Sequence, residues 1–536
     1  MSTQSQSTHP QSRQFHSTQL QATPLQRSTA RTEDGRPLKQ IHLAAHFPGV
    51  NHTTVWSDGN QASQVAFSSF RHFAQNAERG KFDFLFLAEG LRVREQKGLI
   101  HDLDVVGRPN TTAILAAVSA VTRHIGLVGT LSATFNEPYE LARQLASLDH
   151  VSGGRAGWNI VTTSDAFHGE NFRRGAYLDP ADRYRRAEEF LDVAKQLWSS
   201  WADDAVIADA AAGEFVRPGA VRSIDHHGPQ FDVTGRFTTP VSPQRYPVIV
   251  QAGDSPDGRD FASQNAEVIF SRHSEYEAGR QFYSDVKGRL DAVGRDRDSL
   301  KILPAATFIL GDTADEAAER SREVGRLQIS PQTAISFLEQ VWGTDLSGYD
   351  VDGPLPATDP VEDTAGIARG RVRQFADPVA VSRAWRQQSE AEGLSIRELV
   401  ISFAAKHTFV GTPAQVAETI NRHVQNDASD GFVIVGHTSP TGLDEFVDTV
   451  IPELQERGVY RRDYDEGATL RQTLGLPTPV PLRAREKGMG SAAVASAAGS
   501  AAPGVSAGAT TSASGDTADG ASTVVLAHSA PASTAR

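Results

Sequence analysis

The stretches IGLVGTL (125–131) and WNIVT (158–162) decide the fold that the sequence predicts. Both are rich in apolar and β-branched residues, which is typical of buried strands. Between them, residues 138–150 carry leucines at helical spacing. Strand, helix and strand in this order form the repeating unit of a parallel α/β fold.

Hydroxyl side chains stand at the ends of these two strands and are the first candidates for a site. They are Thr130 in the first stretch and residues 162–164 (Thr-Thr-Ser) after the second. In a parallel barrel the carboxyl ends of the strands carry the chemistry. Hydroxyl groups with little charge around them favour a neutral, hydrogen-bonding aromatic ligand over a metal ion.

Working outward, eight strand-then-helix units follow one another along the chain. The strands are predicted near residues 41, 82, 125, 158, 247, 268, 302 and 431. Residues 82–89 (FDFLFLAE), 247–252 (PVIVQA) and 431–436 (GFVIVG) are almost continuously apolar, as strands buried on both faces are. Eight such units predict an α/β fold that closes as a (β/α)8 TIM barrel. A doubly wound open sheet is the alternative.

Composition divides the chain into three parts. Residues 1–38 are rich in Gln, Ser and Thr and are predicted to be a disordered arm. Residues 39–483 hold the barrel, with an insertion at about 329–400 where the alternation breaks. This insertion and the charged loop 90–110 are expected to fold over the barrel mouth. Residues 484–536 are rich in Ala, Ser, Gly and Thr and are predicted to be a disordered tail.

Charge and composition exclude several classes of function. The formal net charge is −13 and no block of Lys or Arg is present, so neither nucleic acid nor an anionic membrane is an expected partner. The chain has no cysteine, which excludes disulfides, thiolate metal sites and a cysteine nucleophile. It has no apolar run of about 18 residues and no apolar leader, so we expect a cytoplasmic protein without a membrane span.

No pattern in the sequence indicates a metal site. His42 and His46 share one face of the first strand, but no HExxH motif or nearby carboxylate accompanies them, so we interpret them as barrel-lining or hydrogen-bonded histidines. Glu89 ends a buried strand, where a carboxylate is costly without a partner. A functional role or a structural salt bridge would explain it.

Two loops at strand ends add further candidates. His52 and Trp56 follow the first strand and either wall a substrate pocket or belong to a plain surface loop. The turn Gly253-Asp254-Ser255 precedes a helix, and backbone N–H groups at a helix start favour an anion. A plain capped turn is the alternative. Asp254 would oppose an anion, so its side chain is expected to point away.

Three longer segments carry a resemblance to a known family. They are FDFLFLAE (82–89), GTLSATFNEPYELARQLASLDHVSGGRAGWNIVTT (129–163) with RYRRAEEFLDVAKQLWSSW (183–201), and GLDEFVDTVIPELQERGVYRRDYDEGATLRQTLGLPTP (442–479). They resemble the bacterial-luciferase-like flavin monooxygenases. Within these, they are similar to the branch of the nitrilotriacetate, dibenzothiophene-sulfone, pristinamycin-synthase and long-chain alkane monooxygenases. The resemblance covers roughly residues 40–480.

The resemblance implies a TIM barrel that uses FMN as FMNH2, supplied by a separate NAD(P)H:FMN oxidoreductase. The enzyme would insert one atom of O2 into a small organic substrate, and a homodimer or homotetramer is expected. Family contacts to FMN fall on Glu89, Thr130, Thr163, Tyr184, Gly253, Asp254 and Ser255. The candidate catalytic residues are His52 and Ser164.

The sequence departs from the family pattern at three positions. Glu89 stands for the usual Asp, Asp254 stands where Ser is common, and Ser164 stands where the alkane enzyme carries a histidine. Alkane hydroxylation is therefore not favoured. A small organosulfur or xenobiotic substrate is favoured slightly, and an aminopolycarboxylate would require basic groups such as Arg92, Arg94 and Arg174. The alternatives are a deazaflavin-dependent dehydrogenase of the same superfamily and a non-catalytic partner subunit.

Overall fold

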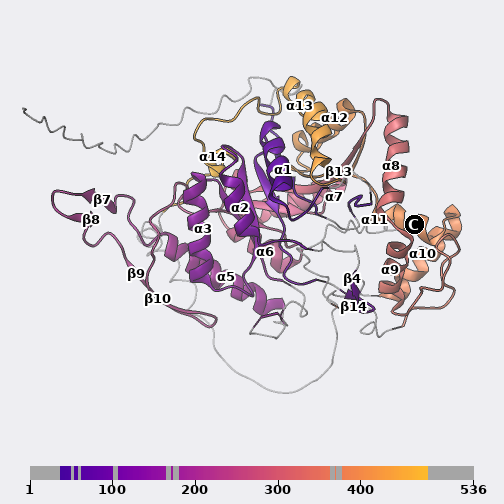
Figure 1. The fold of residues 1–536 in the computed structure, drawn as a ribbon, viewed down its shortest axis with the longest axis horizontal. Helices are drawn as coiled ribbons and strands as arrows, with labels where there is room; N and C mark the ends of the chain where they lie inside the picture. The colour runs from indigo at the N-terminus through magenta and orange to yellow at the C-terminus, as the bar shows by residue number, and fades with distance from the viewer. Residues whose placement is uncertain are drawn as a thin grey trace, which may run out of the picture.

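The computed structural model describes most of the chain between residues 37 and 480 (Figure 1). The described residues are 37–49, 53–57, 62–93, 95–100, 107–163, 169, 171–172, 180–361, 368–369 and 377–480. The predictions for residues 1–36 and 481–536, which include nearly all of the arm and the tail, lie outside the described residues. Within the described part, every helix is too short or too polar to cross a bilayer.

Eight parallel strands form a closed ring, and each strand pairs with the next one in chain order. The last strand pairs with the first, which closes the barrel. The predicted TIM barrel and all eight predicted strand positions are therefore confirmed, and the open sheet is excluded. The strands are β1 (His42–His46), β2 (Phe84–Leu87), β5 (Gly126–Ser132), β6 (Ala156–Val161), β11 (Val248–Gln251), β12 (Val268–Ser271), β13 (Lys301–Leu310) and β16 (Gly431–Val435).

The inside of the ring is filled by apolar side chains at alternate strand positions, because successive side chains of a strand point to opposite faces. Leu470 joins this core from a short carboxyl-terminal helix, α14 (Leu470–Thr473), which the sequence did not predict, and Leu474 joins it from the residue after that helix. An added Cβ at Gly126, the first residue of β5, would collide with Leu470. Helix α14 therefore closes the amino-terminal end of the barrel and leaves the carboxyl end for a site.

Helices surround the barrel, and each follows a strand (Figure 1). Thr313 caps one of them by accepting the backbone N–H of Glu316. The helices next to the barrel are α1 (Phe67–Arg79), α2 (Thr111–Ser119), α3 (Pro138–Ser152), α5 (Pro180–Trp198), α6 (Pro256–Asn265), α7 (Tyr276–Ala292), α8 (Ala314–Gln328), α12 (Pro413–Gln425) and α13 (Ile451–Glu456).

The helical segment after β16 contains a π-helical turn. The structure has a 3₁₀ turn, η2 (Thr441–Leu443), a π-helical turn, η3 (Phe446–Val450), and then α13. Pro452 has no N–H to donate and stands at the start of α13, so the regular α-helical pattern is interrupted before it. A further 3₁₀ turn, η1 (Arg297–Ser299), precedes β13.

Additional elements leave the barrel on two sides (Figure 1). Residues 203–245 form two hairpins, β7 (Val206–Asp209) with β8 (Glu214–Val216) and β9 (Ser223–His227) with β10 (Asp232–Arg236). On the other side, α9 (Pro331–Trp342), α10 (Pro378–Glu392) and α11 (Ile396–Ala404) share a separate hydrophobic cluster. After them, β15 (Phe409–Gly411) extends the sheet beside β13.

The loop after β2 is tied to this helical segment. Strand β3 (Glu95–Gln96) pairs with β4 (Leu99–Ile100) and, on its other side, with β14 (Ala368–Arg369). The Gln96 side-chain amide donates to the Glu339 carboxylate over 2.6 Å. Lys97 forms ion pairs with Glu339 and Asp345. Two segments that are far apart in sequence, and that were both expected at the barrel mouth, are therefore in contact.

Helix α2 packs against β5 at a glycine, and this contact allows a stability prediction. An added Cβ at Gly129 would lie 2.7 Å from Thr111 Cγ2 and 2.9 Å from Leu115 Cδ1. We expect Gly129→Ala to lower the free energy of unfolding by about 1–3 kcal/mol, because a well-packed core resists an extra methyl group. Gly288→Ala in α7 is the control, since nothing lies within 4 Å of its added Cβ. Equal urea midpoints for the two variants would contradict the expectation.

Candidate active site

The strand ends of β5 and β6 present a buried pair of neutral polar side chains. Thr130 and Asn159 are paired in register, and the Asn159 Nδ2 donates to Thr130 Oγ1 over 3.0 Å. Each residue is only 1% exposed. Within the described part of the chain, Asn159 Oδ1 has no hydrogen-bond partner. A buried carbonyl oxygen in this state indicates a missing donor such as a ligand or a water molecule.

A second polar group links the ends of β2, β5 and β6. The Ser132 backbone N–H donates to Glu89 over 3.2 Å, and the Thr163 hydroxyl donates to Ser132 Oγ over 2.7 Å. Thr163 has a φ of +47°, a left-handed conformation that is costly for a β-branched residue. Such strain is typical of residues that a functional site holds in place.

Burial shifts the ionisation of Glu89. It raises the pKa of Glu89 to about 7, although the Ser132 N–H acts to lower it. The side chain is half-buried at the barrel mouth. Near neutral pH the carboxyl group is therefore present in both protonation states, and it can donate or accept a hydrogen bond.

The shift gives a pH dependence whose sign is defined. Because the pKa of Glu89 is raised on folding, the unfolding free energy falls as pH rises from about 4.5 to about 7. We expect Glu89→Gln to remove the part of the decrease in unfolding free energy that Glu89 causes. The unfolding free energy of the variant should therefore increase relative to that of the wild type between pH 4.5 and 7.5. Urea unfolding at both pH values checks the expectation. A wild-type-to-variant difference that does not change with pH would contradict it.

A partly open cavity lies between the ends of β6 and β11. There, Tyr184 of α5 faces the turn after β11. A Cβ added to Gly253 would lie 2.6 Å from the Tyr184 hydroxyl oxygen, and a Cβ added to Gly258 would lie 2.8 Å from it. The two glycines thus bring the backbone close to this hydroxyl. The lining residues are Ile160, Val161, Thr162, Thr163, Tyr184, Ala187, Gln251, Ala252, Gly253 and Phe261.

Ser255 and Asp254 complete this turn in different ways. Ser255 is the N-cap of α6 and accepts the Gly258 N–H over 3.1 Å. Asp254 is not part of the cavity lining and forms ion pairs with Arg259, Arg272 and His273 at 2.8–2.9 Å. Burial acts to raise the pKa of Asp254, but His273 and the two arginines lower it to about 2. Its charge is thus compensated by Arg259 and Arg272, with His273 as a further partner, outside the cavity.

These groups fit FMN on structural grounds. A phosphate at the start of α6 would meet the positive end of the helix dipole, backbone N–H groups and the Tyr184 hydroxyl. Gln251 lines the cavity, and its Oε1 has no hydrogen-bond partner among the described residues, so the cavity has a buried acceptor that lacks a donor. Neutral groups that donate and accept hydrogen bonds suit an aromatic ring system with amide-like edges.

The floor beneath the strand ends is apolar and uncharged. The Phe86 and Phe270 rings are stacked with centroids 5.2 Å apart, and His46 lies 5.5 Å from Phe86. Burial, and then the charge of Arg108, lower the pKa of His46 to about 3. His46 is therefore neutral at physiological pH. Within the described residues, no group of three or more His, Asp or Glu side chains is arranged to hold a metal ion.

The structure joins most of the predicted site residues through partners that the sequence did not reveal. Ser132 links Glu89 to Thr163, and Asn159 contacts Thr130. These linking residues were visible in sequence only as polar positions in otherwise apolar strands. The predictions for His52, Ser164, Arg94 and Arg174 lie outside the described residues. Trp56 is described and is 49% exposed.

Comparison with known proteins identifies the family. The family model described as luciferase-like monooxygenase matches residues 49–430. The chain belongs to this family. The resemblance predicted from the sequence is confirmed. We therefore interpret the strand-end site as that of a luciferase-like monooxygenase.

Relatives of the luciferase-like family cover most of the chain. N-acetyl-S-(2-succino)cysteine monooxygenase of Bacillus subtilis (strain 168) is 38% identical over 449 residues, which are 82% of this chain and 98% of the relative. Nitrilotriacetate monooxygenase component A of Aminobacter aminovorans is 39% identical over 446 residues, 81% of this chain and 94% of the relative. The predicted enzyme class, a flavin-dependent monooxygenase, is confirmed at this level.

A solved structure supports the flavin assignment. Riboflavin lyase, solved with modified FMN and riboflavin as substrate, superposes with a TM-score of 0.67 at 30% identity, covering 82% of this chain and 97% of that chain. The fold of a flavin-binding member thus extends over the same part of the chain as the strand-end site.

Proposed function

We propose that this protein is the oxygenating component of a two-component system. It takes FMNH2 from a separate NAD(P)H:FMN oxidoreductase and uses O2 to oxygenate a small organic substrate. The observation that carries the proposal is a group of polar side chains at the strand ends, next to the start of α6, where an anion would bind. We call this group the flavin cup; it consists of Glu89, Thr130, Ser132, Asn159, Thr163, Tyr184 and Gln251. A cytoplasmic location belongs to the same proposal, because NAD(P)H and the reductase are needed nearby. A homodimer or homotetramer is proposed from the family resemblance.

The residues of the cup divide the work of holding the cofactor. Tyr184 and the backbone of the Gly253–Ser255 turn bind the phosphate, and Ser255 fixes the start of α6. Asn159, held by Thr130, and Gln251 offer carbonyl oxygens to N–H groups of the ligand. Glu89 binds at the opposite side, linked to Thr163 through Ser132. When bound, FMNH2 supplies the electrons that place one oxygen atom in the substrate and release the other as water.

Exclusion of water is the second task of the protein. The stacked Phe86 and Phe270 rings and the neutral His46 give an apolar floor. The pairing of β3 with β14, together with the contact of Gln96 with Glu339, supports a cover over the mouth built from the loop after β2 and the helical segment 331–404. A dry site limits the uncoupled reduction of O2 to hydrogen peroxide, which competes with oxygenation of the substrate.

The proposal is tested by supplying photoreduced FMN without any reductase or NAD(P)H. With ¹⁸O2 and a panel of small organosulfur compounds and carboxylates, we expect one labelled oxygen atom in the product, detected by mass spectrometry. Oxidised FMN under the same conditions is the control and should give no product. If turnover required NAD(P)H bound to this chain, the two-component assignment would be wrong.

A further inference from the structure

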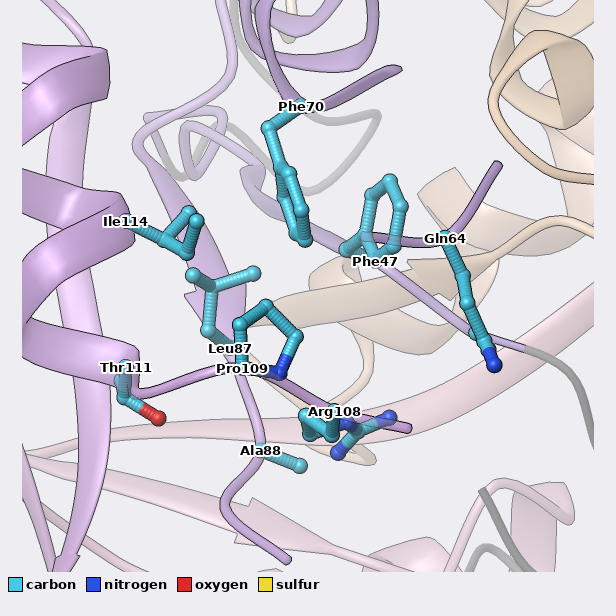
Figure 2. A pocket seen from close by; sticks show the side chains of 10 residues that line it. Phe47, Gln64, Phe70, Leu87, Ala88, Arg108, Pro109, Thr111 and Ile114 are labelled. Atoms are coloured by element: carbon cyan, nitrogen blue, oxygen red, sulfur yellow. The ribbon is translucent and has the colours of Figure 1, made fainter. Parts of the chain in front are cut away.

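A second, partly open pocket lies beside the barrel mouth between the ends of β1 and β2 and the helices α1 and α2 (Figure 2). Its wall is mainly apolar. Among the described lining residues, one side chain is basic and none is acidic. The lining residues are Phe47, Gly49, Gln64, Phe70, Leu87, Ala88, Arg108, Pro109, Thr111 and Ile114.

Thr111 offers this pocket a buried hydroxyl group. It is 2% exposed, and within the described chain its Oγ1 has no hydrogen-bond partner. Its methyl group faces Gly129 of β5, where an added Cβ would lie 2.7 Å away. The hydroxyl is turned toward the side of the pocket where Ala88 and Arg108 lie (Figure 2). A buried hydroxyl without a partner is costly, so a ligand atom is expected to contact it.

Two positive groups lie near this hydroxyl. Thr111 is the first residue of α2, so the positive end of the helix dipole is at the pocket. Arg108 lines the same wall, and its Nη2 donates to the Pro48 carbonyl oxygen over 3.1 Å, which fixes the guanidinium group in place. The combination of one guanidinium, one hydroxyl and a helix start is suited to a single carboxylate.

From this geometry we propose that the pocket binds the substrate, and that the substrate is a compact organic monocarboxylate. Its carboxylate contacts Arg108 and Thr111, and its apolar part packs against Phe47, Phe70 and Leu87. Ala88, which lines the pocket, directly precedes Glu89 of the proposed flavin site in the chain. Because Arg108 is the one cation among the described lining residues, these residues leave the further charges of a polycarboxylate without partners. This inference rests on the proposed function.

The test is calorimetric titration of the full chain, saturated with FMN, with hexanoate and hexanamide. The two probes have the same carbon chain and differ in charge. We expect hexanoate to bind at least about tenfold more tightly, as for a charge-assisted hydrogen bond. Nitrilotriacetate is expected to bind more weakly than hexanoate.

Matched variants assign the effect to the two side chains. Arg108→Gln is expected to remove the preference for hexanoate, whereas Arg108→Lys keeps part of it. Thr111→Val is expected to weaken hexanoate binding about fivefold, and Thr111→Ser, which keeps the hydroxyl, about twofold at most. If Arg108→Gln does not fold by circular dichroism, the two Thr111 variants decide.

The outcomes separate this inference from the function on which it rests. Equal affinity for the two probes, tighter binding of nitrilotriacetate, or a hexanoate preference that survives Arg108→Gln would overturn the monocarboxylate pocket. FMN titration of the same samples reports on the flavin site alone. FMN binding without a carboxylate preference leaves the proposed function standing, whereas failure to bind FMN overturns that function instead.

Discussion

Replacing Gly253 by alanine is expected to lower the affinity for FMN by about 10- to 100-fold, which corresponds to the loss of a hydrogen bond to a charged group. The added Cβ would lie 2.6 Å from the Tyr184 hydroxyl oxygen, so this side chain must move away from the turn that binds the phosphate. Fluorescence titration with FMN measures the change.

The stability of the variant distinguishes a local effect from a folding defect. The atoms that crowd the added Cβ at Gly253 include the far ends of the Tyr184 and Gln251 side chains, which can move at small cost. We therefore expect the thermal midpoint to stay close to that of the wild type. Gly348→Ala is the control, since its added Cβ meets nothing within 4 Å. If Gly253→Ala bound FMN as well as this control, the phosphate site would lie elsewhere.

Asp83→Asn is expected to lower the free energy of unfolding by about 3–5 kcal/mol, because it breaks a buried ion pair while leaving its partner charged. Asp83 is fully buried at the start of β2. Its carboxylate accepts the Leu43 N–H over 2.7 Å and contacts Arg461 Nη2 at 2.6 Å and His42 Nδ1 at 3.0 Å. These contacts hold the amino-terminal ends of β1 and β2 against the carboxyl-terminal segment.

The same carboxylate predicts how the loss depends on pH. Burial acts to raise the pKa of Asp83, but Arg461 and then His42 lower it below its usual 3.8. Because the pKa is depressed on folding, the stabilisation is present above pH 3.8 and is lost as pH falls through the folded-state pKa. The difference between wild type and Asp83→Asn should therefore be constant above about pH 5 and shrink in acid.

Urea unfolding of three proteins tests this expectation. Asp448→Ala is the matched control, because Asp448 forms an ion pair with Arg79 at the surface, where the Asp448 side chain is 55% exposed. Exposed pairs contribute about 0–1 kcal/mol, so this variant should unfold nearly as the wild type does. A similar small loss for Asp83→Asn would show that the buried network is not important for the barrel.

The barrel could be predicted from the sequence because each of its strands is a buried apolar run flanked by a helix with regular spacing. Strand β15, with three residues, is too short to give such a signal. Helix α14 has four residues, and its role depends on Leu470 reaching Gly126, a contact across 344 positions that no local pattern encodes. Similarly, the interruption of the last helix depends on a single proline, Pro452.

The site was predictable as a set of positions but not as a set of contacts. The strand-end rule and the family resemblance located Thr130, Thr163 and Tyr184. The contact of Thr130 with Asn159 depends on the register between β5 and β6, which the sequence does not specify. The ion pairs of Asp254 depend on Arg272 and His273, which follow the next strand. The pocket at Arg108 and Thr111 gave no signal, because its walls come from four separate elements.

The most direct measurement is an anaerobic titration of the full chain with photoreduced FMN, beside a reduced deazaflavin. We predict that about one FMNH2 binds per chain in the micromolar range and more tightly than the deazaflavin, and that admitting O2 then oxidises the bound cofactor. Binding of FMNH2 only at millimolar concentration would indicate a non-catalytic subunit. Preferential binding of the deazaflavin, with hydride transfer in the absence of O2, would indicate a dehydrogenase. Either result would contradict an oxygenase that depends on borrowed FMNH2.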